Sequence, residues 1–177
     1  MIPSEQQYTP GPAGGARVEK KDGDKWTLIL VRELRHSPEK VWAALTDPAQ
    51  LREWAPFVVD GNIGTAGATV NLTWVGNPNP IKTTVTRAEA PKVLEYNDYR
   101  WELEPVGNGT RLTMWAAIDR RFMAWGAAGW HIAFDVLDRL LSGNPIARFD
   151  AGVNAMKFQG WKRLKEEYGE QFGLASS

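Results

Sequence analysis

The chain has 177 residues, of which 43% are hydrophobic and 24% are charged, as in an ordinary globular protein. Its 21 basic and 21 acidic residues cancel, which excludes an overall field that would favour nucleic acid or an anionic membrane. The absence of cysteine excludes disulfides, thiol catalysis and cysteine-ligated metals. We therefore expect a cytoplasmic protein with a single core.

Residues 1–15 are rich in proline and glycine and contain no basic start followed by an apolar run. They predict a disordered tail and no signal peptide. A short strand over 17–20, a turn over 21–24 and a long strand over 26–36 follow. No apolar stretch of the chain approaches the roughly 20 residues that a membrane span needs.

Two short helices are predicted directly after the long strand. Ser37-Pro38 is typical of a helix start, with serine as the cap and proline at the first helical position. The first helix runs from Pro38 to about Leu45. Asp47-Pro48 repeats the signal and opens a second helix that ends near Trp54.

Hydrophobic residues then alternate with period two as far as residue 119, which predicts a meander of strands. The predicted strands are 57–61, 68–75, 81–90, 93–99, 100–106 and 111–119. The turns between them are short, so neighbouring strands must be antiparallel. Strand parity places Trp74, Tyr96, Asp98, Trp101 and Met114 on the inner face of a sheet that is covered on one side.

A long helix over 128–143 is predicted to cover that sheet. Trp130, Phe134 and Leu137 follow the spacing of a helix face that packs on a core. The other face carries His131 and Asp135. Asn144-Pro145 ends this segment, and a final amphipathic helix is predicted over 155–172.

Three blocks of the chain resemble a known family. They are SPEKVWAALTDP at 37–48, RWELEP at 100–105 with GTRLT at 109–113, and AGWH at 128–131 with the leucines that follow. In this order they resemble the SRPBCC (START/Bet v 1-like) superfamily. Within it they resemble the branch named for the activator of heat-shock protein 90 ATPase.

The resemblance implies an α+β helix-grip fold, in which a curled antiparallel sheet wraps round a long C-terminal helix. It also implies a cavity for a hydrophobic ligand between the sheet and that helix. We expect the domain to span 16–143, with 144–177 as a linker and helical extension packed on it. The chain would then be a single-domain relative of the co-chaperone's carboxy-terminal module.

The residues that carry acid–base or metal chemistry are few. His36 lies at the junction before the Ser37 cap, where a structural role is expected. His131 and Asp135 are four residues apart on a helix, as in a carboxylate-oriented base or in a solvated or interface pair. Neither histidine has the partners of a zinc or iron site, and the glycines form no phosphate loop. We predict no metal, no cofactor and no catalytic residue.

Arg32 shares the inner face of the long strand with Leu28, Leu30 and Leu34. A buried charge needs a partner, and Asp98 is the predicted one. The pair is either structural or a site in which the guanidinium receives a ligand's carboxylate or enolate. The predicted ligand-binding residues are Arg32, Trp74, Tyr96, Asp98, Trp101, Met114, Trp130 and Phe134.

Three functions remain open at this point. The first is a protein that binds a small apolar or amphipathic molecule between sheet and helix. The second is an enzyme of cyclase or hydrolase type that uses Arg32, Asp98 or Tyr96. The third is a chaperone-linked interaction module. Separately, the outward Trp115 and the final helix suggest a homodimer. Fold does not choose between them.

Overall fold

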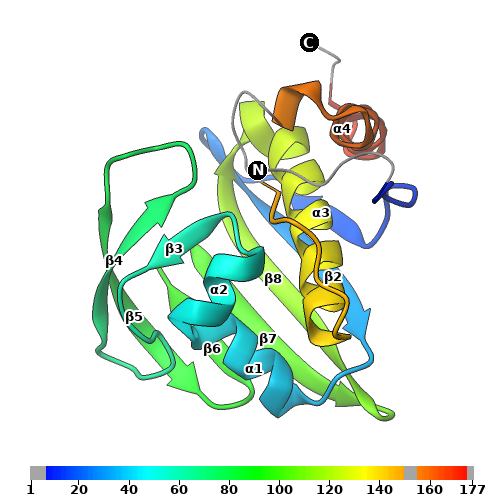
Figure 1. Ribbon diagram of the computed structural model, residues 1–177. Coiled ribbons are helices and arrows are strands. Elements are labelled where there is room, and N and C mark those ends of the chain that lie inside the picture. Colours follow the sequence, from blue (N-terminus) through cyan, green and yellow to red (C-terminus); the bar gives the residue numbers. More distant parts are fainter. Residues whose placement is uncertain (1–6, 150–154, 175–177) are drawn as a thin grey trace.

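The computed structural model describes residues 7–149 and 155–174. Its strands form one antiparallel sheet in the order β1-β2-β8-β7-β6-β5-β4-β3 (Figure 1). The strands are β1 Ala16–Glu19, β2 Lys25–Leu34, β3 Phe57–Val59, β4 Thr69–Trp74, β5 Ile81–Glu89, β6 Val93–Tyr96, β7 Tyr99–Val106 and β8 Gly109–Asp119. From β3 to β8 the strands follow the order of the chain, as their short turns require, and β2 pairs with β8.

The sheet is apolar on the side that faces the helices. Along β8, Leu112, Met114 and Ala116 are fully buried, whereas the residues between them are partly exposed. A register shift between Val85 and Arg87 interrupts the pairing of β5 with β6. Irregularities of this kind bend a strand and increase its twist, and Figure 1 shows the sheet curling round the helices.

The tight turn Asn97-Asp98 separates β6 from β7, where the sequence predicts a strand that continues to residue 99. Tyr96 pairs with Tyr99 across the turn, and Asn97 has a φ of 50°. Asparagine tolerates this left-handed conformation better than most residues, which suits it to a two-residue hairpin. Asp98 therefore lies at the surface, and its predicted place on the inner face is wrong.

Two capped helices follow β2 as predicted. They are α1 Pro38–Thr46 and α2 Pro48–Trp54. The hydroxyl of Ser37 accepts a hydrogen bond from the backbone N–H of Lys40 at 3.2 Å. The carboxylate of Asp47 accepts one from the N–H of Ala49 at 3.0 Å. These bonds satisfy backbone donors that a helix start leaves free, so each helix begins where its cap stands.

The long helix is buried on two sides. The short 3-10 turn η1 Arg120–Phe122 leads into α3 Met123–Leu141, which crosses the concave face of the sheet (Figure 1). Trp130 and Phe134 face the sheet and are at most 4% exposed. Ile132 and Val136, on the opposite side by helical spacing, are at most 1% exposed. A helix that buries both sides needs a second layer over it.

The C-terminal helix provides part of this second layer. The final elements are η2 Ala155–Lys157 and α4 Gln159–Gln171, within the predicted range of 155–172. Trp161, Leu164 and Tyr168 of α4 are buried, and Figure 1 shows α4 packed against the first half of α3. The apolar side of α4 thus completes a sheet–helix–helix stack.

Residues 7–15 also pack on the domain, so the prediction of a disordered tail is wrong for them. Tyr8 is 4% exposed, and the carbonyl of Gly15 accepts a hydrogen bond from the N–H of Val31 at 2.7 Å. The N–H of Ala13 donates to Glu167 of α4 at 2.8 Å. The glycine and proline content suggested disorder, but Tyr8 contributes an anchor that composition does not reveal. Residues 1–6 lie outside the described part.

The predicted α+β helix-grip fold is confirmed, with two short helices after β2 and a final helix added to the long one. Its predicted boundaries at residues 16 and 143 stay predictions. Among residues 7–149 and 155–174, no helix is long and apolar enough to cross a membrane.

Replacing Phe134 by alanine tests whether the centre of the space under α3 is packed. The Phe134 ring lies 6.0 Å from that of Trp101 and 6.5 Å from that of Trp54 and is fully buried. Phe134→Ala should lower the free energy of unfolding by about 3–5 kcal/mol in urea denaturation. Phe122→Ala, at a half-exposed ring, is the control and should change it by no more than about 0.5 kcal/mol. Equal losses would contradict a packed centre.

Candidate functional site

An apolar pocket of about 420 Å³ opens between the first half of α3, the sheet and the chain around α4. Its lining residues are Pro56, Trp74, Tyr99, Ile118, Phe122, Trp125, Gly126, Gly129, Trp130, Phe149, Met156 and Trp161. Seven of them are aromatic and none is an acid, an amine or an imidazole. We refer to this space as the aromatic pocket. Its size and lining are typical of a site for a small apolar ligand.

Two glycines of α3 leave room for the pocket. Gly126 and Gly129 are three residues apart and therefore lie on the same side of the helix. A Cβ atom added at Gly129 would meet no other heavy atom within 4 Å, apart from its own helix neighbourhood. At Gly126 it would lie 3.0 Å from the Cδ1 atom of Ile118. The open volume therefore reaches the helix surface at Gly129.

The inner wall of the pocket consists of Trp74, Tyr99 and Trp130. Their rings lie against one another, with centroids 5.8 Å apart for Tyr99 and Trp130 and 6.0 Å apart for Trp74 and Tyr99. Behind them, the Trp101 ring lies 5.6 Å from that of Trp130. These edge-to-face and tilted contacts continue into the packed centre of the domain, so the inner wall is rigidly supported.

Tyr99 supplies the hydroxyl group of the inner wall. Burial raises the pKa of Tyr99 well above its ordinary value, and a hydrogen bond with Trp130 opposes that shift only in part. The phenol is therefore neutral across the physiological range and acts as a hydrogen-bonding group. It can orient a polar atom of a ligand without carrying charge into the pocket.

The outer wall consists of Phe122, Trp125, Met156 and Trp161. Phe122 is 50% exposed and Met156 is 47% exposed, so these two mark the side of the pocket that is open to solvent. The Trp125 and Trp161 rings meet edge to face at 5.3 Å. The ammonium of Lys165, one turn after Trp161 in α4, lies 4.6 Å from the centroid of the Trp125 ring and 5.9 Å from that of Trp161.

The structure separates the predicted ligand-binding residues into three groups. Trp74 and Trp130 line the aromatic pocket. Four others are buried in the packed centre with at most 1% of their surface exposed, namely Tyr96, Trp101, Met114 and Phe134. The indole N–H of Trp101 donates to the hydroxyl of Tyr96 at 3.1 Å, which satisfies both groups inside the core. Arg32 and Asp98 form the third group.

The predicted pairing of Arg32 with Asp98 is wrong. Asp98 accepts a hydrogen bond from the side chain of Lys25 at 2.9 Å, and both groups are largely exposed. Arg32 points from β2 toward α3, where its guanidinium donates to Asp135 at 2.5 Å. The alternation of side chains along β2 is enough to place Arg32 on the side of the sheet that faces the helix. The turn at Asn97 is what removes Asp98 from its reach.

Asp135 is the centre of a polar network on the side of α3 that faces away from the aromatic pocket's inner wall. Its carboxylate accepts hydrogen bonds from Arg32 and from the hydroxyl of Tyr8. His131, one turn earlier, has its Nδ1 atom 2.6 Å from the hydroxyl of Tyr168. That hydroxyl donates to the carbonyl of Gly14 at 2.9 Å. The network therefore ties the N-terminal segment and α4 to α3.

The prediction of a solvated or interface pair at His131 and Asp135 is corrected by this arrangement. His131 is only 5% exposed because α4 and the N-terminal segment of the same chain cover it. Burial lowers the pKa of His131, Arg32 and Arg163 lower it further, and Asp135 and Glu167 oppose the shift. Burial and the hydrogen bond to Asp135 raise the pKa of Tyr8. A neutral imidazole and a neutral phenol beside one carboxylate are typical of a structural network.

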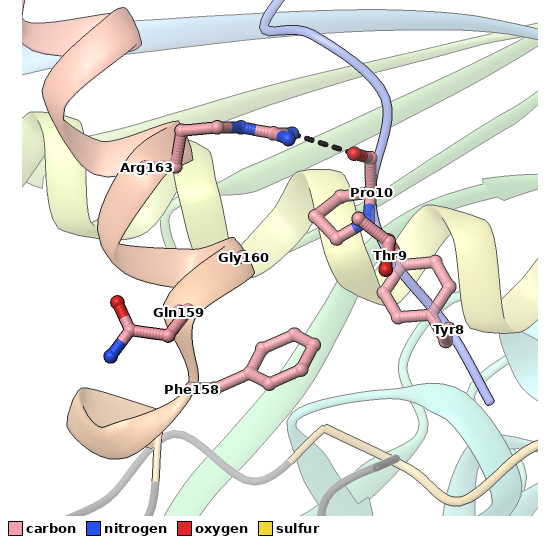
Figure 2. Close-up of a pocket in the computed structure, with 7 residues that line it drawn as sticks. All are labelled: Tyr8, Thr9, Pro10, Phe158, Gln159, Gly160 and Arg163. Carbon is pink, nitrogen blue, oxygen red and sulfur yellow. Dashed lines mark hydrogen bonds between the residues drawn. The ribbon is translucent and has the colours of Figure 1, made fainter. Parts of the chain in front are cut away.

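A smaller hollow of about 270 Å³ lies where the N-terminal segment crosses the start of α4 (Figure 2). Tyr8, Pro10, Phe158 and Arg163 are among its lining residues. Figure 2 shows Arg163 reaching the carbonyl of Pro10, to which it donates at 2.6 Å. A Cβ atom at Gly160 would lie 2.6 Å from Pro10, so this crossing requires glycine. The hollow is part of a seam between two segments of the chain.

Among residues 7–149 and 155–174, no three histidine, aspartate or glutamate side chains lie close enough together to hold an ion. The chemical groups that distinguish the aromatic pocket are its rings, the Tyr99 hydroxyl and the nearby ammonium of Lys165.

The chain matches a known protein family over most of its length. Residues 25–167 match the sequence model of the family described as polyketide cyclase/dehydrase and lipid transport. That range includes β2 and most of α4, and therefore the whole aromatic pocket. No curated protein matches the chain.

Several solved structures share the fold. CalU16 from Micromonospora echinospora has a TM-score of 0.67 and 21% identity, and the match covers 92% of this chain and 94% of that one. EF2215 from Enterococcus faecalis, described as a conserved protein of unknown function, has a TM-score of 0.65 and 16% identity over 88% and 89% of the two chains. MLL2253 from Mesorhizobium loti has a TM-score of 0.58 and 25% identity over 68% and 99%.

The buried histidine predicts a dependence of stability on pH. The unfolded chain takes up a proton at His131 as the pH falls below about 6.5, whereas the folded chain resists it because its pKa is lowered. The free energy of unfolding should therefore fall as the pH decreases from 7 to 5. His131 should account for part of that fall, because only the unfolded chain gains its proton readily in this range.

Urea denaturation of the wild type and of His131→Gln at pH 7, 6 and 5 measures this contribution. The variant is expected to be less stable at pH 7, because it loses the contact with Tyr168, but to have the shallower slope. His36→Gln is the matched control for the other histidine of the chain. Parallel slopes for the wild type and His131→Gln would contradict a neutral, buried imidazole.

Proposed function

This chain belongs to the polyketide cyclase/dehydrase and lipid transport family, and we propose that it binds a small hydrophobic or amphipathic molecule in the aromatic pocket. The observation that carries the proposal is the pocket itself. It is an open volume of about 420 Å³ with an apolar, largely aromatic lining, inside a domain whose centre is otherwise packed. The inner wall of Trp74, Tyr99 and Trp130 forms the binding surface for the apolar part of the ligand.

The lining favours binding over proton transfer. Its residues offer rings, aliphatic carbons and one neutral hydroxyl, but no carboxylate, amine or imidazole that would act as a general base. Arg32, Asp98 and Tyr96, which the cyclase or hydrolase hypothesis requires, lie outside the lining. In the proposed function, the ligand is held and released, and burial of its apolar surface supplies the affinity.

Three finer assignments accompany this proposal. The blocks at 37–48, 100–113 and 128–131 support kinship with the branch named for the activator of heat-shock protein 90 ATPase. The cytoplasmic location rests on the cysteine-free composition. A homodimer would use the outer face of the sheet, where Trp115 is partly exposed. There the guanidinium carbon of Arg100 lies over the Trp115 ring, 5.6 Å from the ring centroid.

Filling the pocket from α3 tests the binding site. Gly129→Leu places a side chain in the open volume, and the neutral dye phenylnaphthylamine, whose fluorescence rises in apolar surroundings, reports binding. The variant should bind the dye at least about tenfold more weakly, since several apolar contacts are lost. Gly129→Ala is the matched control and should still bind. Replacing a helical glycine stabilises by up to about 1 kcal/mol, so neither variant should unfold the domain.

Native mass spectrometry of the protein purified from its own host tests for a natural ligand. A small molecule should remain with the wild type and with Gly129→Ala, and it should be absent from Gly129→Leu. Dye binding and ligand retention that are the same in all three proteins would place the binding elsewhere and overturn the proposal.

A further inference from the structure

We propose that the ligand of the aromatic pocket is an anionic amphiphile, and that Lys165 binds its acid group while the rings hold its apolar body. The inference rests on the proposed function and adds to it a chemical class of ligand and a residue that selects it. Nothing in the pocket lining neutralises a charge, so an acid group must lie at the open side. Lys165 is the cation placed against the Trp125 and Trp161 rings of the outer wall.

The position of Lys165 is defined by two rings of the outer wall. Its ammonium lies 4.6 Å from the centroid of the Trp125 ring and 5.9 Å from that of the Trp161 ring. Both rings line the pocket, and the two meet edge to face. An ammonium near ring faces is attracted by their electron density, which holds it without neutralising its charge. It keeps three N–H donors available for a carboxylate, sulfonate or phosphate.

Lys165 also has no competing anion within residues 7–149 and 155–174. Among the residues that the structure describes, no carboxylate forms an ion pair with it, although Glu166 and Glu167 are its neighbours in α4. Glu167 is engaged by Arg163 at 3.2 Å. The lysine side chain is partly buried against the tryptophans, so a bound anion would meet it in surroundings less polar than bulk water.

Two arginines that could compete for the anion are already paired with carboxylates. Arg121, beside the exposed Phe122, binds the carboxylate of Asp119 through two nitrogens at 3.1 and 2.8 Å. Arg32, for which the sequence left open either a structural ion pair or anion binding, is held by Asp135 on another side of α3. The ammonium of Lys165 is therefore better placed than the guanidinium of Arg32 to bind an anion at the pocket.

A pair of dyes separates the two parts of the inference. Anilinonaphthalene sulfonate and phenylnaphthylamine share the same ring skeleton, and only the first carries an anionic group. Lys165→Met should weaken binding of the sulfonate by about three- to tenfold. This loss lies between that expected for an exposed ion pair and that expected for a hydrogen bond to a charged group. The substitution should change binding of the neutral dye by less than twofold. Lys165→Arg should restore sulfonate binding.

Lys162→Met is the matched control, because it removes the same charge from an exposed position of the same helix. It should leave both dyes within twofold of the wild type. A second measurement needs no variant: raising the salt concentration should weaken sulfonate binding to the wild type and leave the neutral dye unaffected.

The outcomes distinguish this inference from the function on which it rests. Neutral-dye binding that depends on Gly129, together with sulfonate binding that is insensitive to Lys165 and to salt, overturns the inference and leaves the proposed function standing. Equal losses in Lys165→Met and Lys162→Met also overturn it, because the effect would then be one of net charge. If the binding of neither dye depends on Gly129, both proposals fail.

Discussion

The arrangement of the outer layer depends on the hydrogen bonds that the carboxylate of Asp135 accepts. This carboxylate is partly buried on a helix that is covered on both sides, and a buried charge is costly unless it is paired and hydrogen-bonded. Its partners come from distant parts of the chain: Arg32 from β2 and Tyr8 from the N-terminal segment. Satisfying this one group therefore fixes where that segment runs and how β2 lies under α3.

The same network anchors the helix α4, which contributes Trp161 to the aromatic pocket. Tyr168 of α4 is anchored on His131 and on Gly14, about two helical turns from Trp161, which lines the pocket. The hydrogen bonds at one end of α4 thus hold the outer wall at the other end. Charge is concentrated where segments must be joined, and the space for an apolar ligand is left free of it. This division follows from the cost of burying an unpaired charge beside an apolar ligand.

Much of this fold could be predicted from the sequence because its signals are local. Ser37-Pro38 and Asp47-Pro48 mark helix starts through bonds made within three residues, and the period of two along 111–119 predicts which side of β8 is buried. Local signals failed at Asn97, because an asparagine in a left-handed turn resembles any polar residue of a strand in a period-two pattern. That single turn decided the partner of Arg32.

The candidate site was predictable only in part, because it depends on how two helices meet. Trp74 and Trp130 were expected to contact a ligand, but the same reasoning selected Tyr96, Trp101 and Phe134, which fill the core instead. Periodicity assigns a residue to the inner face and does not show where that face is left uncovered.

The aromatic pocket opens where α3 presents Gly126 and Gly129 and where α4 contributes Trp161 to the lining. One signal for this arrangement was present in the sequence: Ile132 and Val136 continue the apolar surface of the long helix beyond its first face, and so require a covering element. The apolar side of the final helix is the complementary surface. When a helix has a second apolar face that the predicted sheet does not cover, the sequence therefore predicts a further layer over it. A pocket can open at the edge of that layer.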